Sequence, residues 1–155
     1  MTPDSLPKHL ALAFLLALVA YAVFYSTIEH RRTRLGPWQV SFKTDGRGTP
    51  AIFINQPSLA ITNQEIAFAG GHASSTGTVM LRFSEARPVP FDVPFGQCLF
   101  LDTMSLPGTV VLNLFGHQLQ LLPRALTIDG TERSWRSGET IALSPTNRLA
   151  PGSQQ

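Results

Sequence analysis

The sequence predicts a mostly β protein: one N-terminal transmembrane helix followed by an antiparallel β-sandwich of about nine or ten short strands, with a partly closed β-barrel as the alternative. Three observations lead to this fold class. Residues 10–28 form an apolar run without charge, glycine or proline. Beyond residue 35 the hydrophobic pattern changes from helical spacing to alternation. No later stretch offers a helical pattern free of proline and glycine, so helical crossovers are not expected.

The apolar run is long enough to cross a lipid bilayer. As a helix, its nineteen residues would extend about 28 Å, close to the roughly 30 Å thickness of the hydrocarbon core. A core helix of a soluble domain usually carries a polar stripe, and this run has none. We therefore expect a single-pass membrane protein with a tail over residues 1–9 and a bilayer contact over residues 10–28.

A cleaved secretory signal peptide is the competing interpretation of this run. Ala20-Tyr21-Ala22 resembles a cleavage site and lies at a plausible distance from Lys8. The apolar run continues past it through Tyr25, which favours a retained signal-anchor over cleavage after Ala22.

A basic juxtamembrane linker is predicted over residues 29–36, where Arg31, Arg32 and Arg34 follow the apolar run. Lys8 is the one basic side chain before the run, so the positive-inside rule alone would place the C-terminal domain in the cytoplasm. The arginine excess is small and anchored bacterial sandwiches are often exported, so we favour an extracytoplasmic domain and keep the cytoplasmic alternative open. Ten arginines against two lysines fit a GC-rich bacterial genome, which suggests a bacterial inner membrane.

Charge is distributed unevenly along the chain. Residues 35–155 hold eight basic and eight acidic side chains, so the formal net charge of +2 arises entirely before residue 35. A neutral domain does not supply the positive field on which nucleic-acid binding depends. We therefore expect no nucleic-acid partner.

Short β-type segments run through the domain predicted over residues 37–144. Trp38, Val40 and Phe42 alternate with polar residues, as in a half-buried strand. The further strand candidates are residues 51–55, 59–62, 65–69, 78–83, 97–101, 109–115, 118–122, 125–129 and 140–143. Residues 145–155 contain too few apolar side chains to pack, so a flexible C-terminal tail is expected there.

Two β-hairpins are expected within this domain. The first covers residues 110–122 and turns near Gly116. The second covers residues 126–135, where Asp129-Gly130 is typical of a two-residue turn of the primed type.

A repeated Val-Pro-Phe tripeptide ends at Phe91 and again at Phe95. Proline fixes φ and lacks an amide donor, so this segment is expected along a sheet edge or between the sheets rather than in a central strand. Phe91 and Phe95 then either close one end of the sandwich or face outward as an apolar contact.

Trp135 is predicted to be exposed because it follows a polar segment. Flanked by Arg133 and Arg136, it would suit a protein contact or a platform for stacking a sugar. Together with Phe91 and Phe95, these residues form the predicted interaction surface.

The sequence contains no pattern that specifies catalysis. Cys98 lies among apolar residues, whereas a catalytic cysteine needs a polar setting, so we reject its pairing with His72 or His117 as a base. The histidines show no spacing typical of zinc ligands. We therefore expect no enzyme activity and assign no catalytic, cofactor-binding or metal-binding residues.

The function expected from these features is a non-catalytic interaction or assembly module that is held at a membrane and binds a partner protein. The alternative is an exported or surface-displayed carbohydrate-binding domain. That alternative would place exposed aromatic side chains such as Trp135 and Phe91 around one concave face.

Overall fold

The computed structural model describes residues 5–73 and 77–144, and at Ser5 and residues 31–34 it describes the backbone alone. The predicted flexible tail over residues 145–155 therefore lies outside the described residues.

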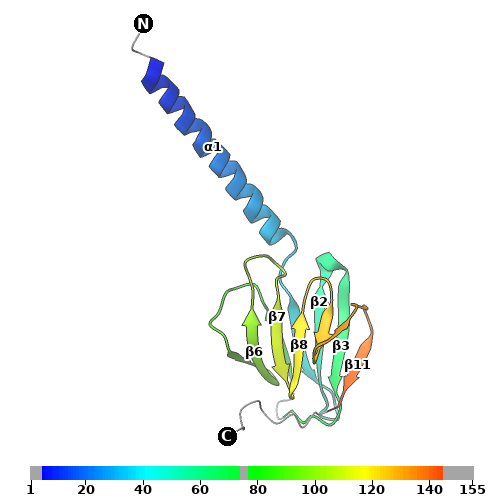
Figure 1. Ribbon diagram of the computed structural model, residues 1–155. Coiled ribbons are helices and arrows are strands. Elements are labelled where there is room, and N and C mark those ends of the chain that lie inside the picture. The colour runs from blue at the N-terminus through cyan, green and yellow to red at the C-terminus, as the bar shows by residue number, and fades with distance from the viewer. Residues whose placement is uncertain (1–4, 74–76, 145–155) are drawn as a thin grey trace. The chain divides into compact units, whose positions relative to one another are not determined.

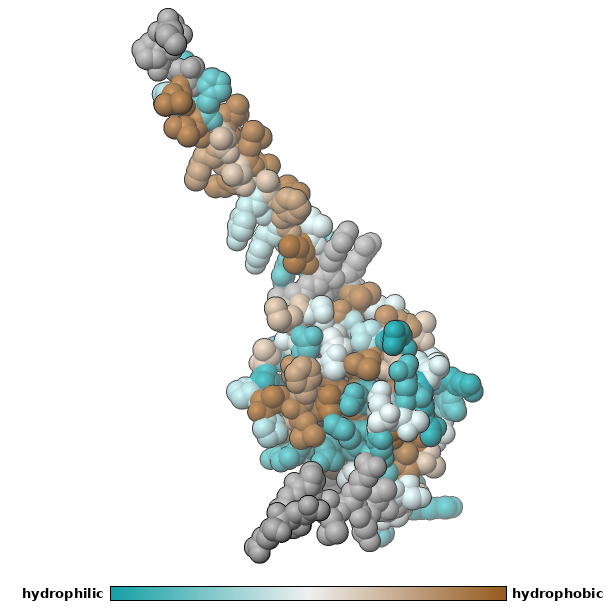
Figure 2. All heavy atoms as spheres, in the orientation of Figure 1, coloured by the Kyte–Doolittle hydropathy of each residue, from teal (hydrophilic) through white to brown (hydrophobic). Residues whose placement is uncertain are grey.

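The chain divides into two compact units, Met1–Arg34 and Leu35–Gln155. The first unit contains helix α1, Ser5–Arg34. Within this helix, Leu6–His30 is long and apolar enough to cross a membrane. Figure 2 shows hydrophobic residues along the visible side of the helix.

The large apolar side chains of α1 are exposed, among them Phe14, Leu16 and Phe24. Burial in a protein core therefore does not account for the apolar composition of the helix. Secretory signal sequences share this composition, so retention of the helix, as opposed to cleavage after Ala22, stays a prediction.

Helix α1 is longer than the predicted apolar run at both ends. It begins at Ser5 and continues through residues 29–34, which the sequence assigns to a linker. Pro7 lies in the first turn, where its missing amide donor costs no helical hydrogen bond. The next breakers are Gly36, with a φ of 71°, and Pro37, so the helix persists up to them. Which part of the helix lies in a bilayer stays a prediction.

The second unit consists of two sheets packed face to face (Figure 1). Sheet A has the order β11-β3-β2-β1-β4, and sheet B has the order β10-β9-β8-β7-β6-β5. The strands of sheet A are β1 (Gln39–Thr44), β2 (Pro50–Gln56), β3 (Ile61–Phe68), β4 (Thr78–Arg82) and β11 (Thr140–Leu143). Those of sheet B are β5 (Phe91–Val93), β6 (Gly96–Leu101), β7 (Val110–Leu114), β8 (His117–Leu121), β9 (Leu126–Ile128) and β10 (Thr131–Arg133). The predicted mostly β, sandwich-like fold is confirmed.

The core lies between the two sheets. Val40 and Phe42 of β1 are buried, as their alternation with polar residues predicts, and Leu112 of β7 is buried from the other sheet. Trp38 is fully buried, and its Nε1 donates a hydrogen bond to the carbonyl oxygen of Gly108 at 3.0 Å. Trp38 is therefore the first large core residue of the domain and not a residue of the membrane interface.

Both predicted hairpins are confirmed. Phe115 and Gly116 connect β7 to β8 with φ values of 50° and 79°. Asp129 and Gly130 connect β9 to β10 with φ values of 50° and 82°. Two successive positive φ values characterise the type I′ turn, whose twist matches that of the paired strands.

Two predicted strands, residues 59–62 and 65–69, are in fact one continuous strand, β3. A 3₁₀ turn, Pro57–Leu59, precedes it, and the Gln56 side chain accepts a hydrogen bond from the Ser58 amide. Ala60 then turns the chain with a φ of 56°. This compact turn reverses the chain before residue 61, and the gap expected at residues 63–64 is an irregularity within β3, where the register with β2 shifts and Asn63 has a φ of 50°.

One pair of strands is parallel, which corrects the expectation of a fully antiparallel sandwich. Residues 134–139 carry the chain from β10 in sheet B to β11 in sheet A. Gly138 donates its N–H to the carbonyl oxygen of Thr62 at 3.1 Å, and Gln64 Nε2 donates to that of Glu139 at 2.8 Å. These bonds fix the crossover beside the start of β3, so β11 runs in the same direction as β3.

Candidate functional site

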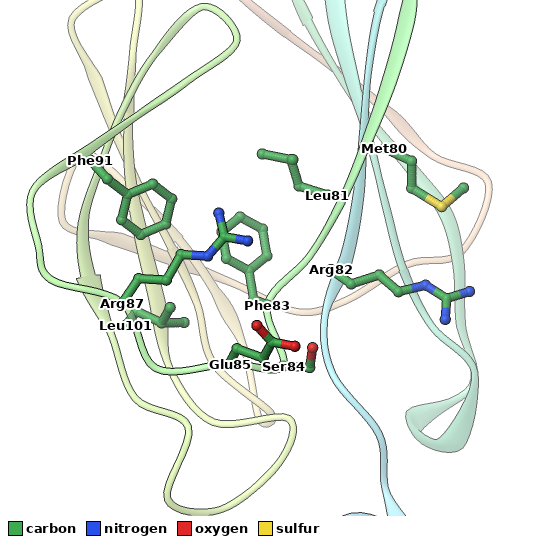
Figure 3. Close-up of a pocket in the computed structure, with 9 residues that line it drawn as sticks. All are labelled: Met80, Leu81, Arg82, Phe83, Ser84, Glu85, Arg87, Phe91 and Leu101. Carbon is green, nitrogen blue, oxygen red and sulfur yellow. The ribbon is translucent and has the colours of Figure 1, made fainter.

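A cavity of about 300 Å³ opens at the side of the sandwich where β4, an edge strand of sheet A, and β5, an edge strand of sheet B, meet. Its lining, drawn in Figure 3, comes from β4, β5, β6 and the loop between β4 and β5: Met80, Leu81, Arg82, Phe83, Ser84, Glu85, Arg87, Phe91 and Leu101. Small-molecule sites usually measure roughly 300–1,000 Å³. This cavity is therefore at the lower end of that range.

The inner wall of the cavity is apolar. Leu81 lies opposite Val40 in the β1–β4 register, so both side chains lie on the core face of sheet A. Phe83 is buried, whereas Phe91 and Leu101 are half-buried. Figure 3 shows Leu81 and Phe83 turned toward Phe91, with Met80 and Arg82 turned the opposite way.

Two arginines and one glutamate lie at the rim of the cavity. The guanidinium carbon of Arg87 is 5.7 Å from the centroid of the Phe91 ring, a cation–π distance. Within the part of the chain that the structure describes, Arg82, Arg87 and Glu85 form no ion pair. The rim therefore carries an excess of one positive charge beside an apolar wall.

Strand β4 has an uncovered backbone edge. The Phe83 N–H donates to the carbonyl oxygen of Trp38 at 3.0 Å, which makes these residues a hydrogen-bonded pair of the antiparallel ladder. Because such pairs alternate with non-bonded pairs, Leu81 also directs its N–H and C=O toward β1. Met80 and Arg82 direct theirs the other way, where no described strand pairs with β4.

Exposed apolar side chains lie on β4 and on β6. Val79 and Met80 of β4 are 46% and 56% exposed, and Phe100 of β6 is 50% exposed. Phe100 lies opposite Val111 on the outer face of sheet B, next to Leu99 at a register shift. Figure 2 shows hydrophobic residues gathered on the face of the domain that carries β6.

The two phenylalanines of the repeated tripeptide lie in different settings. Phe91 is on β5, an edge strand, opposite buried Cys98, so the predicted edge position of this segment is confirmed. Phe95 follows in the turn with a φ of 72°, and its ring centroid lies 5.6 Å from those of Phe42 and Phe115. Phe95 thus closes the sandwich at this end, and Phe91 lines the cavity.

The structure contradicts the prediction that Trp135 is exposed. Its ring is half-buried with its centroid 5.2 Å from that of Trp38, and its Nε1 donates to the carbonyl oxygen of Leu122 at 2.9 Å. The prediction is wrong because Trp135 lies in the crossover to β11, which holds the ring against the core. With its N–H and one face engaged, this ring offers little to a stacked sugar.

Arg133 and Arg136 line a second hollow of about 300 Å³ together with Glu139. Arg136 Nε lies 3.8 Å from Glu139 Oε2, and both side chains are exposed. Exposed ion pairs contribute little to stability, typically about 0–1 kcal/mol.

The five residues of the predicted interaction surface therefore do not form one patch. Phe91 lines the first cavity and the two arginines line the second, whereas Phe95 and Trp135 pack against the core. The predicted membrane-flanking residues lie in the last turns of α1: Arg31, Arg32 and Arg34.

Cys98 is a buried thiol whose Sγ donates to the carbonyl oxygen of Phe100 at 3.4 Å. Burial raises the pKa of this thiol from its usual 9.0 to about 11. The reactive thiolate is therefore scarce near neutral pH. The interpretation of Cys98 as a small buried side chain is confirmed.

His117 on β8 is buried, and both of its ring nitrogens are engaged. Its Nδ1 lies 2.7 Å from Asp129 Oδ2, and its Nε2 lies 2.6 Å from the carbonyl oxygen of Ser144. A carbonyl oxygen only accepts hydrogen bonds, so Nε2 carries a proton and neither nitrogen is available as a base for Cys98. His117 instead ties the end of β11 in sheet A to the β9–β10 turn in sheet B.

Of the residues that line the first cavity, the sequence singles out Phe91 alone. A signal for the others is present in β4, where Val79, Leu81 and Phe83 alternate on one face and Met80 adds an apolar side chain on the other. A strand with apolar residues on both faces is expected to be central. Because β4 instead lies at an edge, some of its apolar side chains remain exposed and could contact another molecule.

Among residues 5–73 and 77–144, no three histidine, cysteine, aspartate or glutamate side chains are grouped as metal ligands. No protein-family model, curated protein or solved structure matches the chain. A function for this protein therefore has to be inferred from its own residues.

Proposed function

We propose that this protein is a single-pass membrane protein whose β-sandwich is a non-catalytic interaction or assembly module for a partner protein. The observation that carries the proposal is the apolar surface exposed at two separate places, by Leu99 and Phe100 on β6 of sheet B and by Val79 and Met80 at the β4 edge of sheet A. Exposed apolar surface rimmed by polar residues typically marks a contact with another molecule.

The membrane part of the proposal is supported by Leu6–His30, which is long and apolar enough to cross a bilayer. We place the bilayer contact at residues 10–28, in a bacterial inner membrane, with the β domain on the extracytoplasmic side. The domain carries no net charge over residues 35–155, which supports a protein partner over a nucleic acid.

A non-catalytic role is supported by the settings of the two residues best suited to nucleophilic chemistry. Cys98 is buried with a raised pKa, and His117 uses both ring nitrogens in structural hydrogen bonds. A nucleophile and its base must instead lie within hydrogen-bond reach of each other in an accessible site.

The carbohydrate-binding alternative has less support. It relies on exposed aromatic rings around one concave face, yet Trp135 packs on Trp38 and Phe91 lies below the guanidinium of Arg87. Among the residues of the β domain that the structure describes, the exposed aromatic ring is Phe100, which lacks the hydrogen-bonding edge of tryptophan or tyrosine.

Affinity purification of the full chain in mild detergent tests the proposal. We expect one or a few partner proteins in constant ratio, with reduced recovery by Phe100→Ser. Gln118→Ser, at an exposed polar position of the same sheet, is the matched control and should retain them. Recovery of the wild type as a monomer without reproducible partners would contradict the proposal. Reporter fusions at the C-terminus and N-terminal sequencing would determine the side of the membrane and any cleavage.

A further inference from the structure

We propose that the uncovered edge of β4 binds an extended acidic segment of the partner protein, which adds one strand to sheet A and inserts apolar side chains into the cavity beside β4. This inference rests on the proposed function and names the surface and the chemical class of the partner. It begins from the backbone of β4, because Thr78, Met80 and Arg82 direct their N–H and C=O groups away from β1.

The other edge strands of the two sheets are less suited to such pairing. β5 has three residues and lies between Pro90 and Pro94, which cannot donate a backbone hydrogen bond. β10 has three residues, all of them exposed, and includes Glu132 and Arg133. β11 has four residues, and its end is tied to His117 through the carbonyl oxygen of Ser144. β4 has five residues and carries no charge before Arg82. Proteins usually protect edges with prolines, charges or short strands, and β4 lacks this protection over most of its length.

The side chains of β4 define what an added strand would meet. Side chains opposite Val79 and Leu81 would enter the core face, beside the apolar wall formed with Phe91 and Leu101. A side chain opposite Arg82 would lie on the outer face, within reach of its guanidinium. An alternating pattern of apolar and polar residues therefore fits this edge.

Charge identifies the polar residues of the added strand as acidic. Arg82 forms no ion pair among the described residues and lies on the outer face, where the polar side chains of the added strand would lie. Arg87 lies over Phe91 on the cavity side, where the apolar side chains would enter. A second copy of this chain is a poorer occupant. In a symmetric antiparallel pairing of two β4 strands centred on Met80, Thr78 of each copy would lie opposite Arg82 of the other. Neither copy of Arg82 would therefore gain an opposite charge.

Fluorescence polarisation of labelled octapeptides with the full-length protein in a non-ionic detergent tests the proposal. The probe alternates glutamate and valine, and its matched control alternates lysine and valine. We expect the acidic peptide to bind more tightly, with about a fivefold loss of affinity for Arg82→Ala. Arg124→Ala, at an exposed arginine in the β8–β9 loop, should bind normally. Equal affinity for the acidic and basic peptides would overturn the charge assignment.

Strand addition is tested separately from charge. Met80→Pro removes an outward N–H without breaking a bond to β1, so the fold should persist, as checked by near-ultraviolet circular dichroism, and the acidic peptide should no longer bind. In an antiparallel addition the glutamates lie opposite Arg82 and direct their N–H groups toward β4, so N-methylation of the glutamates should abolish binding and N-methylation of the valines should not. This second comparison leaves the protein unaltered. Unchanged binding by the glutamate-methylated peptide would overturn strand addition.

The failure of this inference differs from the failure of the proposed function. If cellular partners co-purify equally with the wild type and with folded Met80→Pro, the edge assignment is wrong and the interaction module stands. If the wild type recovers no partner, both are wrong. Self-association of the wild type that Met80→Pro removes would show that a second copy occupies the edge and would also overturn the inference.

Discussion

Replacement of Trp135 by alanine should destabilise the β domain by about 2–3 kcal/mol. A fully buried tryptophan is worth about 3–5 kcal/mol relative to alanine, and Trp135 is half-buried, so the lower part of this scale applies. The loss includes the contact with the Trp38 ring at 5.2 Å and the hydrogen bond to the Leu122 carbonyl oxygen at 2.9 Å. Trp135→Phe keeps most of the ring contact and removes the hydrogen bond, so it should cost about 1 kcal/mol.

Urea unfolding of the full chain in detergent, followed by far-ultraviolet circular dichroism, measures this loss. Urea changes the unfolding free energy of a small domain by about 1–3 kcal/mol per molar, so Trp135→Ala should lower the midpoint by about 1–2 M. Arg133→Ala, two residues away and exposed, is the control and should change stability by less than about 0.5 kcal/mol. If Trp135→Ala also falls within that range, the ring is exposed in solution and the packing against Trp38 is refuted.

Three further predictions concern buried positions. The folded state holds the Cys98 proton more tightly than the unfolded chain, so the unfolding free energy should fall as the pH rises from about 9 to about 11. Urea unfolding at a series of pH values should show a smaller fall for Cys98→Ala than for the wild type. An equal fall in both would argue against the raised pKa. His117→Ala removes the hydrogen bonds of the ring to the Asp129 carboxylate and to the Ser144 carbonyl oxygen, so it should cost about 2–4 kcal/mol in urea unfolding. Unchanged stability would be inconsistent with a tie between the sheets. A Cβ at Gly96 would lie 1.9 Å from a carbonyl oxygen of β7, so Gly96→Ala should lower the unfolding free energy by about 3 kcal/mol or more. Gly46→Ala is the control and should be nearly neutral, because a Cβ at Gly46 meets open space. Equal effects of the two substitutions would rule out the tight β6–β7 contact.

Features encoded by neighbouring residues could be predicted from the sequence. The alternation of Val40 and Phe42 with polar residues gives the buried face of β1, and Asp129-Gly130 gives a primed turn because both residues tolerate positive φ. The prolines around β5 restrict it to an edge, which follows from the missing amide donors alone.

Features that depend on distant contacts could not be predicted in this way. Trp135 follows a polar segment, which predicts exposure. The hydrogen bonds of the neighbouring crossover residues to Gln64 and Thr62 instead hold it against the core. The same crossover makes β11 parallel to β3, and no local pattern specifies that direction. The cavity combines side chains of β4 and β6, such as Leu81 and Leu101, whose proximity depends on how the two sheets stack.

Site-specific photo-crosslinking in intact membranes tests the central claim, that a membrane-anchored sandwich binds a partner strand at β4. A benzophenone amino acid would replace Met80 at the uncovered edge of β4, with Glu132 on β10 as the matched position at another edge. We predict that the chain is found in the membrane fraction and that Met80 alone gives an adduct, to an acidic segment of another protein identified by mass spectrometry. Absence of an adduct at Met80, or equal adducts at both positions, would contradict the claim.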